Sequence, residues 1–373
     1  MKIGCPKEIK NNENRIGLTP NAASAYIAAG HQVFIEKNAG LGSSIPDEEY
    51  VKVGAKILPD AKSVWAEADM IVKVKEPLES EYPLMRENQL IYTYFHFAAD
   101  EALTKACLEK KIIGLAYETV EEDRALPLLK PMSEVAGRMA ALMGAFYSGK
   151  TQGGRGLLPM GVTGVAPAEV LVLGGGIVGT NAARVAAGLG CTVTILDLNL
   201  KRLDYLNDVM PANVTSVYSD PVALDTKLRT ADIVVGAVLV PGAVAPKLVR
   251  RHHLKIMKPG AVMVDVAIDQ GGCFETSHAT THTDPIFVED GIIHYCVANM
   301  PGAYARTATY ALNNATIRFG LMLANKGAEK ACRENAALKL GLNVYKGLIT
   351  YKPVAEAFAG MEKLYKPVDE AIA

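Results

Sequence analysis

The sequence lacks paired cysteines, a hydrophobic run of membrane-spanning length and an excess of charge of either sign. Its six cysteines are scattered and form no C-x-x-C pair, which is typical of reduced thiols in a cytoplasmic protein and not of a disulfide framework. The longest apolar run, residues 233–246, contains two prolines and two glycines and is too short to cross a bilayer. A net charge of −1 gives no overall field that would attract nucleic acid or an acidic membrane surface.

Signatures of several other protein classes are absent as well. Residues 1–8 lack the apolar core and cleavage site of a signal peptide, and neither repeats nor low-complexity tracts occur. The motifs G-x-S-x-G and H-E-x-x-H are also missing, which argues against the serine hydrolases and zinc proteases that carry them. Hydrophobic residues, in contrast, make up half of the 373 positions, enough for two domains with cores of their own.

Short apolar runs recur through the second half of the chain, with helical periodicity between most of them. Nearly continuous Val/Ile/Leu runs are typical of strands in a parallel sheet that is covered on both faces. Their alternation with helices predicts a doubly wound α/β domain over residues 130–305. The predicted strands are residues 170–173, 192–196, 214–218, 233–240, 261–268 and 292–298.

The N-terminal part repeats this pattern more weakly, which predicts a second α/β domain. Its predicted strands are residues 2–6, 32–36, 70–74, 90–95 and 112–118, with helices over 21–29 and 100–110. Two long helices are predicted over residues 133–149, with Ser133 as N-cap, and over 304–325. Because such helices commonly flank an inserted domain, we expect residues 306–373 to pack back onto residues 1–129. The first domain would then be discontinuous, with residues 130–305 inserted in it.

A G-x-G-x-x-G motif directly follows the strand predicted over residues 170–173. Gly174 allows the tight turn, Gly176 the approach of a pyrophosphate, and Gly179 the close packing of the next helix, whose N-terminus offers N–H groups to phosphate. The following strand ends on Asp197, where a carboxylate can accept both hydroxyls of an adenosine ribose. Glycines also gather in turns for steric reasons alone, but the complete strand, helix, strand and acid arrangement predicts NAD binding.

Ionisable and polar side chains follow the predicted strands where those strands end. In open α/β sheets, ligands bind beyond the carboxyl ends of the strands. The residues at these positions are Glu8, Lys75, His96 and Glu118 in the N-terminal part, and Asp197, Ser219, Leu239, Asp269 and Asn299 in the second domain. They predict a cleft to which both domains contribute.

The leading candidates also have ordinary structural interpretations. Lys75 could be a solvated lysine at a strand end, although Lys73 and Lys75 alternate with apolar residues, as they would on one face of a strand. His96 lies among aromatics and could be a buried core histidine. Arg15 lies in a polar loop, where it is either a surface arginine or a bidentate clamp for a substrate carboxylate. Asp269 is expected to end its strand and project at the mouth of the sheet.

A group of cysteines and histidines in the second domain raises the question of a zinc site. Its members are Cys273, His278, His282, His294 and Cys296. Their spacing fits no standard structural zinc site, and Thr, Asp and Pro residues surround them as in a loop. The sequence therefore predicts no metal.

Taken together, these motifs resemble those of the bacterial L-alanine dehydrogenases, over essentially the whole chain. The resemblance is carried by residues 6–8, 14–20, 73–77, 94–96, 131–138, 174–197, 265–272 and 297–302. It implies two Rossmann-like domains, a homo-hexamer in the cytoplasm without nucleic-acid or membrane partners, and NAD as the cofactor. The implied reaction interconverts L-alanine with pyruvate and ammonium.

The resemblance also implies roles for individual residues. Arg15 and Lys75 would bind the substrate, and His96 and Asp269 would be the catalytic pair, with Asp269 activating water. The implied nucleotide site comprises Ser133, Gly174, Gly176, Val178, Gly179, Asp197, Arg202, Ser219, Val238, Leu239, Val266, Ala267, Ile268, Asp269, Val297, Ala298, Asn299 and Met300. Asp197 favours NAD over NADP, a preference that Arg202 could soften. One departure is His278, where some relatives carry an arginine near the cofactor.

Two other functions share parts of this pattern. The soluble nucleotide-binding part of a proton-translocating transhydrogenase has the same two-domain plan, and a non-enzymatic NAD-binding regulator could keep residues 174–197. The presence of His96 and Asp269 favours the dehydrogenase over the transhydrogenase. The ionisable groups at four strand ends argue against a regulator.

Overall fold

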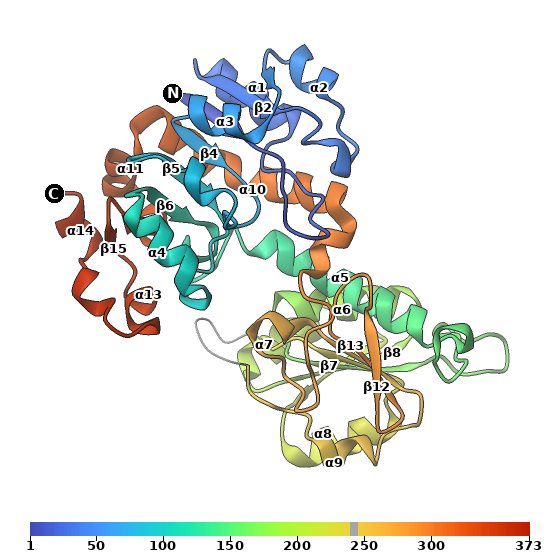
Figure 1. Ribbon diagram of the computed structural model, residues 1–373. Helices are drawn as coiled ribbons and strands as arrows, with labels where there is room; N and C mark the ends of the chain where they lie inside the picture. The colour runs from blue at the N-terminus through green and yellow to red at the C-terminus, as the bar shows by residue number, and fades with distance from the viewer. Residues whose placement is uncertain (239–244) are drawn as a thin grey trace. The chain divides into compact units, whose positions relative to one another are not determined.

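The structure, a computed structural model, describes residues 1–238 and 245–373. It divides into two units, each built around a sheet of its own (Figure 1). The first unit combines Met1–Met132 with Gly302–Ala373, and the second is Ser133–Pro301. Leu239, which the sequence places in the nucleotide site, lies outside the described residues.

The first unit contains an eight-stranded sheet in the order β15-β14-β6-β5-β4-β1-β2-β3. Its parallel strands are β1 (Lys2–Cys5), β2 (Gln32–Glu36), β3 (Lys56–Leu58), β4 (Met70–Val72), β5 (Leu90–Thr93) and β6 (Ile113–Ala116), and its antiparallel ones β14 (Leu342–Tyr345) and β15 (Leu348–Ile349). Because β14 pairs with β6, the C-terminal segment completes a sheet that the N-terminal segment begins.

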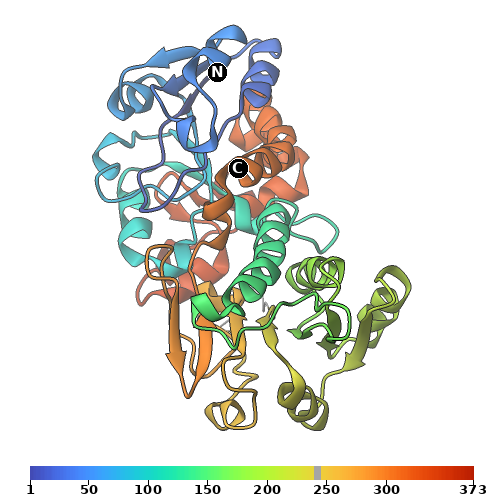
Figure 2. The ribbon, with the colours of Figure 1, turned by 90° about the vertical axis from the view of Figure 1, so that its right-hand side faces the viewer.

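Helices surround this sheet and join the two segments of the first unit. They are α1 (Pro20–Ala28), α2 (Asp47–Lys52), α3 (Ala61–Glu67), α4 (Glu101–Glu109), α10 (Ala305–Lys326), α11 (Ala328–Glu334), α12 (Ala336–Gly341), α13 (Lys352–Ala357) and α14 (Val368–Ala371). The long helix α10 packs beside α1 (Figure 2). The Thr309 hydroxyl accepts the Ile16 N–H at 3.1 Å, and the Asn313 side chain accepts the Thr19 N–H at 2.7 Å. These bonds fix the loop that carries Arg15.

Seven strands of the described chain form the sheet of the second unit, in the order β12-β13-β11-β10-β7-β8-β9. They are β7 (Glu169–Leu173), β8 (Thr192–Asp197), β9 (Val214–Tyr218), β10 (Ile233–Gly236), β11 (Val262–Asp265), β12 (Ile286–Glu289) and β13 (Ile292–Tyr295). All pairs are parallel except β12 with β13. The carboxyl ends of six strands therefore lie along one edge.

Both faces of this second sheet are buried. Along β7, Val170 and Val172 belong to one hydrophobic core, whereas Leu171 and Leu173 belong to another. This alternation explains why the strand reads as an unbroken apolar run. The helices of this part of the chain are α5 (Lys130–Tyr147), α6 (Ile177–Gly188), α7 (Leu200–Val209), α8 (Pro221–Thr230) and α9 (Arg251–Leu254). The predicted doubly wound α/β architecture is confirmed.

Several predicted elements need correction at their ends. The strand predicted over residues 261–268 stops at Asp265 and continues as a 3-10 helix, η6 (Val266–Gln270). The strand predicted over residues 70–74 stops at Val72. In both cases the apolar pattern continues past the strand because the next turn is buried as well; Val74, for example, has no exposed surface. The prediction of Ser133 as an N-cap is wrong, since α5 begins at Lys130.

All six cysteines are free and buried. Across residues 1–238 and 245–373, the search for a helix long and apolar enough to cross a bilayer finds none.

Candidate active site

Four neighbouring parallel strands of the first unit, β6, β5, β4 and β1, end at the same edge of the sheet. The segments just beyond them carry Glu118, His96, Lys75 and Glu8, as the sequence predicted. Hydrogen bonds join these segments in two pairs: Glu8 contacts the backbone of Lys75, and Glu118 contacts the backbone of His96. The sheet thus brings the four predicted strand-end residues of this unit together.

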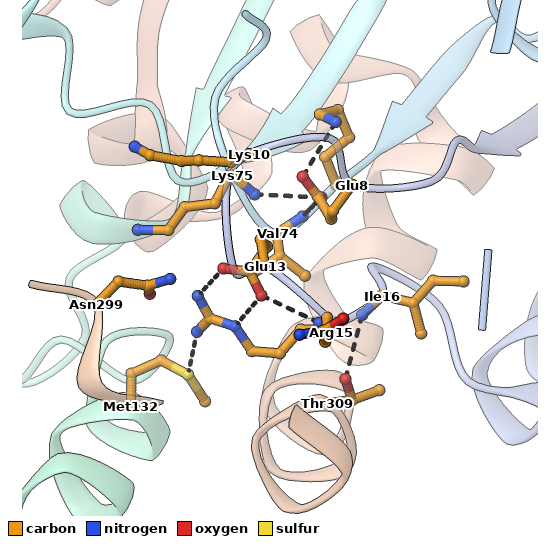
Figure 3. A network of polar contacts seen from close by, with 12 residues as sticks. Glu8, Lys10, Glu13, Arg15, Ile16, Val74, Lys75, Met132, Asn299 and Thr309 are labelled. Atoms are coloured by element: carbon orange, nitrogen blue, oxygen red, sulfur yellow. Dashed lines mark hydrogen bonds and ion pairs between the residues drawn. The ribbon is translucent and has the colours of Figure 1, made fainter. Parts of the chain in front are cut away.

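Arg15 is buried beside this edge, where it forms a side-on ion pair with Glu13 (Figure 3). Its Nε donates to Glu13 Oε1 at 2.7 Å and its Nη2 to Oε2 at 2.5 Å, while Nη1 contacts the Met132 sulfur at 3.0 Å. Burial alone would lower the pKa of the Arg15 guanidinium, but the hydrogen bonds and charge of Glu13 outweigh it and raise the pKa. Because Arg15 is only 2% exposed, the surface-arginine interpretation is excluded.

The backbone around Lys75 is held by a buried carboxylate. Glu8 Oε1 accepts the Val74 N–H at 2.6 Å and the Lys75 N–H at 3.3 Å, and the Thr93 hydroxyl donates to the Lys75 carbonyl at 2.9 Å. Lys73 is completely buried, whereas Lys75 is partly exposed. The strand ends before both residues, so the prediction that they share a strand face is wrong.

Lys73 belongs to a buried charge cluster that also contains Glu8 and Glu81. Its ammonium lies 3.1 Å from a carboxylate oxygen of each glutamate. Burial opposes the charge on Lys73, yet the two carboxylates raise its pKa above the ordinary lysine value. Since Glu8 also binds the backbone of Lys75, this cluster supports the loop on which Lys75 stands.

His96 is exposed, although its neighbours Tyr94, Phe95 and Phe97 are buried. Its backbone adopts the left-handed conformation, with φ 53° and ψ 40°, which a residue with a Cβ rarely adopts. Glu118 stabilises this turn by accepting the His96 N–H at 2.6 Å and the Phe95 N–H at 3.2 Å. The interpretation of His96 as a buried core histidine is therefore excluded. Such local strain often marks functional positions.

In the second unit, the glycine-rich turn follows β7 and leads into α6. Gly174 has a φ of 97°, in the left-handed region, and a Cβ on Gly179 would lie 1.8 Å from the Gly174 carbonyl oxygen. A Cβ on Gly176, in contrast, would meet nothing within 4 Å. Gly176 is the N-cap residue of α6 and provides no side-chain cap. The turn thus leaves open space at a helix N-terminus, an arrangement that fits a pyrophosphate.

Asp197 and Arg202 both bind the backbone of this turn. Asp197 Oδ2 accepts the Gly175 N–H at 2.7 Å, and its Oδ1 accepts the Asn199 N–H at 2.8 Å. Arg202 donates from Nε to the Gly175 carbonyl at 2.6 Å and from Nη2 to the Thr180 hydroxyl at 2.7 Å. Arg202 is thereby directed at the turn itself.

The other residues predicted for the nucleotide site are distributed over the second unit. Ser133 lies in α5 and Val178 in α6, whereas Ser219 and Val238 follow β9 and β10. The remaining ones lie on η6 (Val266, Ala267, Ile268 and Asp269) or after β13 (Val297, Ala298, Asn299 and Met300). Apart from Ser133, all of these follow strands of the parallel sheet, at its carboxyl edge.

Asp269 does not end a strand, contrary to the sequence prediction. It lies in η6, four residues after β11 ends, and it is exposed. The residue at the strand end is Asp265, which is completely buried and accepts the Ala267 N–H at 3.1 Å and the Cys273 N–H at 2.9 Å. Asp265 was not among the residues predicted from the sequence. The sequence feature that could have indicated it is an acidic residue inside an apolar run, immediately before the predicted site residues 266–269.

The cysteines and histidines considered for zinc have other partners. Cys273 lies 3.6 Å from Asp265 Oδ1, and His294 contacts the Thr276 hydroxyl at 2.8 Å. His278 stacks on Phe287 with ring centroids 3.7 Å apart. No group of three or more His, Cys, Asp or Glu residues suited to a metal ion occurs within the described ranges 1–238 and 245–373.

The fold and the site define a two-domain α/β protein with a dinucleotide-binding turn in its second unit. Residues 4–136 match the family described as alanine dehydrogenase/PNT, N-terminal domain, and residues 140–352 match alanine dehydrogenase/PNT, C-terminal domain. The chain belongs to this alanine dehydrogenase/PNT family.

Individual relatives span the whole chain. It is 55% identical to an alanine dehydrogenase of Methanococcus maripaludis and 53% identical to alanine dehydrogenase 2 of Staphylococcus aureus, each over 100% of both chains. Among solved structures it matches an L-alanine dehydrogenase with a TM-score of 0.94, at 48% identity over 97% of this chain and 100% of the other. A transhydrogenase from Sinorhizobium meliloti matches less well, with a TM-score of 0.81 and 25% identity over 94% and 99%.

The glycine turn gives a prediction in which protein stability and cofactor binding respond differently. Gly179→Ala should lower the melting temperature and weaken NADH binding, since its Cβ overlaps the Gly174 carbonyl oxygen. Gly176→Ala should keep the melting temperature but weaken NADH binding about tenfold or more, because the added methyl would occupy the space that we assign to the pyrophosphate. Thermal unfolding and NADH fluorescence titration measure the two effects.

Gly188→Ala is the matched control for both glycine variants. Gly188 lies at the other end of the same helix, and a Cβ there meets nothing within 4 Å. NADH affinity should stay at its wild-type value, and the melting temperature should not fall, because alanine is favoured over glycine in a helix. Normal NADH binding by Gly176→Ala would contradict the proposed position of the pyrophosphate.

Proposed function

We propose that this protein is an NAD-dependent alanine dehydrogenase. It would convert L-alanine, water and NAD⁺ to pyruvate, ammonium, NADH and a proton, and catalyse the reverse reductive amination. The observation that supports this most directly is the 53–55% identity to proteins named alanine dehydrogenase, over the full length of both chains. The transhydrogenase match is weaker in identity and in TM-score, which favours the dehydrogenase.

In this proposal the residues of the first unit bind and polarise the substrate. Arg15 binds the substrate carboxylate, with Glu13 holding the Nε and Nη2 edge of its guanidinium in place. Lys75 stabilises the negative charge that develops on the carbonyl oxygen in the direction of amination. The Arg15 guanidinium and the Lys75 ammonium would thus both face the substrate, where their positive charges suit a carboxylate and a developing oxyanion.

His96 and Asp269 form the proposed catalytic pair. Bound NAD supplies a hydride acceptor at nicotinamide C4 for the hydrogen on the alanine Cα. Asp269 takes a proton from the water that attacks the resulting iminium carbon, and His96 moves a proton to or from the new hydroxyl. The exposure of both side chains supports these roles, because each can reach a substrate without a core rearrangement.

For the cofactor, we propose a site at the glycine turn and the carboxyl edge of the second sheet. Gly174, Gly176 and Gly179 would admit the pyrophosphate, and Asp197 would accept the ribose hydroxyls. A 2′-phosphate would meet the negative charge of Asp197, so the proposal includes a preference for NAD over NADP. Ser133, Ser219, Val238, the η6 residues and residues 297–300 would complete this site, and Leu239 is assigned to it by resemblance alone.

We also propose a homo-hexamer in the cytoplasm. Supporting an assembly, large apolar side chains of the second unit are exposed on and after α5, namely Leu142, Phe146, Leu158, Met160, Val162 and Val165. Exposed apolar groups of this kind are typical of protein interfaces. Six buried free thiols support a reducing compartment.

A coupled assay tests the proposed reaction. NADH should be consumed with pyruvate and ammonium, and 2-oxoglutarate should react about 10²-fold more slowly or worse, because its second carboxylate would enter without a cationic partner. Glyoxylate should be a moderate substrate, since one methyl group discriminates by only about 1–3 kcal/mol. If the protein binds NADH normally but consumes none with any 2-oxo acid, the result would favour a non-enzymatic NAD-binding regulator instead.

A further inference from the structure

The turn that follows Asp269, residues 270–275, has its carbonyl groups bound by a neighbouring segment of the chain. Residues 245–249 run beside residues 270–275, and their main chain binds part of the turn. The Ala245 N–H donates to the Gln270 carbonyl at 3.1 Å, and the Leu248 N–H donates to the Cys273 carbonyl at 2.8 Å. The main chain of this neighbouring segment therefore satisfies two carbonyls of the turn.

A single side chain, Lys247, satisfies three more. Its ammonium donates to the carbonyl of Gly272 at 2.8 Å, to that of Phe274 at 3.2 Å and to that of Gly271. A lysine ammonium has three donors and no acceptor, so its capacity matches these three carbonyls. Gly271 and Gly272 both have positive φ, 85° and 76°, a conformation that an unsupported chain would leave readily.

The N–H groups of the same turn are held from the other side by Asp265. Its Oδ2 accepts the Cys273 N–H at 2.9 Å, the Phe274 N–H at 3.2 Å and the Ser277 hydroxyl at 2.6 Å. Asp265 is completely buried, where charge-assisted hydrogen bonds are strong. An anion thus binds the donors of the turn and a cation binds its acceptors.

We propose that Lys247 is a positioning residue for Asp269. By joining the three carbonyls beyond η6, it fixes the turn through which η6 connects to the sheet, and so fixes the carboxylate of Asp269 relative to the nucleotide turn of the same unit. This inference rests on the proposed function, in which Asp269 is catalytic. It gives Lys247 no contact with substrate or cofactor.

Lys247→Met tests the proposal, because methionine keeps the length of the chain but donates no hydrogen bond. We expect kcat to fall about 10²-fold, the effect of a misplacement of about 1 Å. The loss of NADH affinity should be much smaller than the loss of kcat, because the glycine turn of the proposed cofactor site keeps its own hydrogen bonds. Lys258→Met is the matched control: Lys258 is also half-buried in the second unit, but it pairs with Asp232 at 2.9 Å. A kcat for Lys247→Met equal to that of Lys258→Met would overturn the proposal.

A double-mutant cycle with Asp269→Asn separates positioning from general stability. With the enzyme at micromolar concentration, a turnover rate reduced about 10⁴-fold, the largest loss expected for Asp269→Asn, is still measurable. If Lys247 acts through Asp269, Lys247→Met should slow the Asp269→Asn enzyme by no more than about twofold. A similar slowing in both backgrounds would mean a merely structural role and would overturn the proposal.

The cycle also distinguishes this inference from the proposed function. A fully active Asp269→Asn would refute the catalytic assignment itself. If kcat is low in Asp269→Asn but close to wild type in Lys247→Met, only the positioning role of Lys247 is refuted. Should Lys247→Met fail to fold, Lys247→Leu, which also donates no hydrogen bond, goes through the same cycle with the same expected and contradicting outcomes.

Discussion

Asp269→Asn is expected to lower kcat about 10²–10⁴-fold, the range for loss of a general base. An amide cannot take a proton from the attacking water, so substrate and cofactor still bind but the iminium is not hydrated. NADH affinity should stay close to wild type, since the substitution is isosteric and Asp269 is exposed on η6. Steady-state kinetics in the direction of alanine oxidation and NADH titration measure the two quantities.

Two further aspartates serve as controls for this prediction. Asp208→Asn changes an exposed residue of α7 and should leave both quantities unchanged. Asp265→Asn should instead lower the melting temperature, because the buried carboxylate accepts several backbone N–H groups and a hydroxyl. Wild-type turnover by Asp269→Asn would contradict its catalytic role, and a large loss of stability in that variant would assign it the structural role of Asp265.

The positions of many candidate site residues could be predicted because the carboxyl ends of parallel strands lie at the same edge of a sheet. A short apolar run followed by a charged residue predicts both the strand and the position of that residue, as for Lys75 and His96. The same reasoning placed Asp197 at the end of β8, where the structure has it. Strand ends were harder to predict, since Val74 and Ile268 are buried although they lie beyond the strands. The apolar pattern of the sequence reflects burial. Burial continues past the last hydrogen bond that pairs each of these strands with its neighbour.

The supporting residues could not be predicted in this way, because their partners are backbone groups or charges distant in the sequence. Lys247 satisfies carbonyls more than 20 residues away, and a carbonyl carries no sequence signal. Lys73 is 65 residues from Glu8. Local patterns therefore predict the residues that meet the ligands better than the residues that hold them in place.

Lys73→Met is expected to destabilise the first unit by about 3–5 kcal/mol, the cost of removing one partner of a buried ion pair. The substitution leaves Glu8 and Glu81 buried without the ammonium that lies 3.1 Å from each. Urea unfolding followed by tryptophan fluorescence measures the change, because Trp65, the only tryptophan of the chain, is buried in the core of this unit. Lys2→Met, which removes an exposed ion pair with Glu67, should change stability little.

The pH dependence of the Lys73 variant identifies the cause of its instability. Burial raises the pKa of Glu8 above its ordinary value of 4.5, against the opposing effect of Lys73, so the folded protein binds this proton more tightly than the unfolded chain. Ionisation of Glu8 therefore costs stability as the pH rises above about 4.5, and the cost grows when Lys73 is absent. The difference between wild type and Lys73→Met should widen from pH 5 to pH 8, since the raised pKa of Lys73 keeps it charged throughout that range. A difference that is independent of pH would mean that Lys73 stabilises the unit by packing rather than by charge.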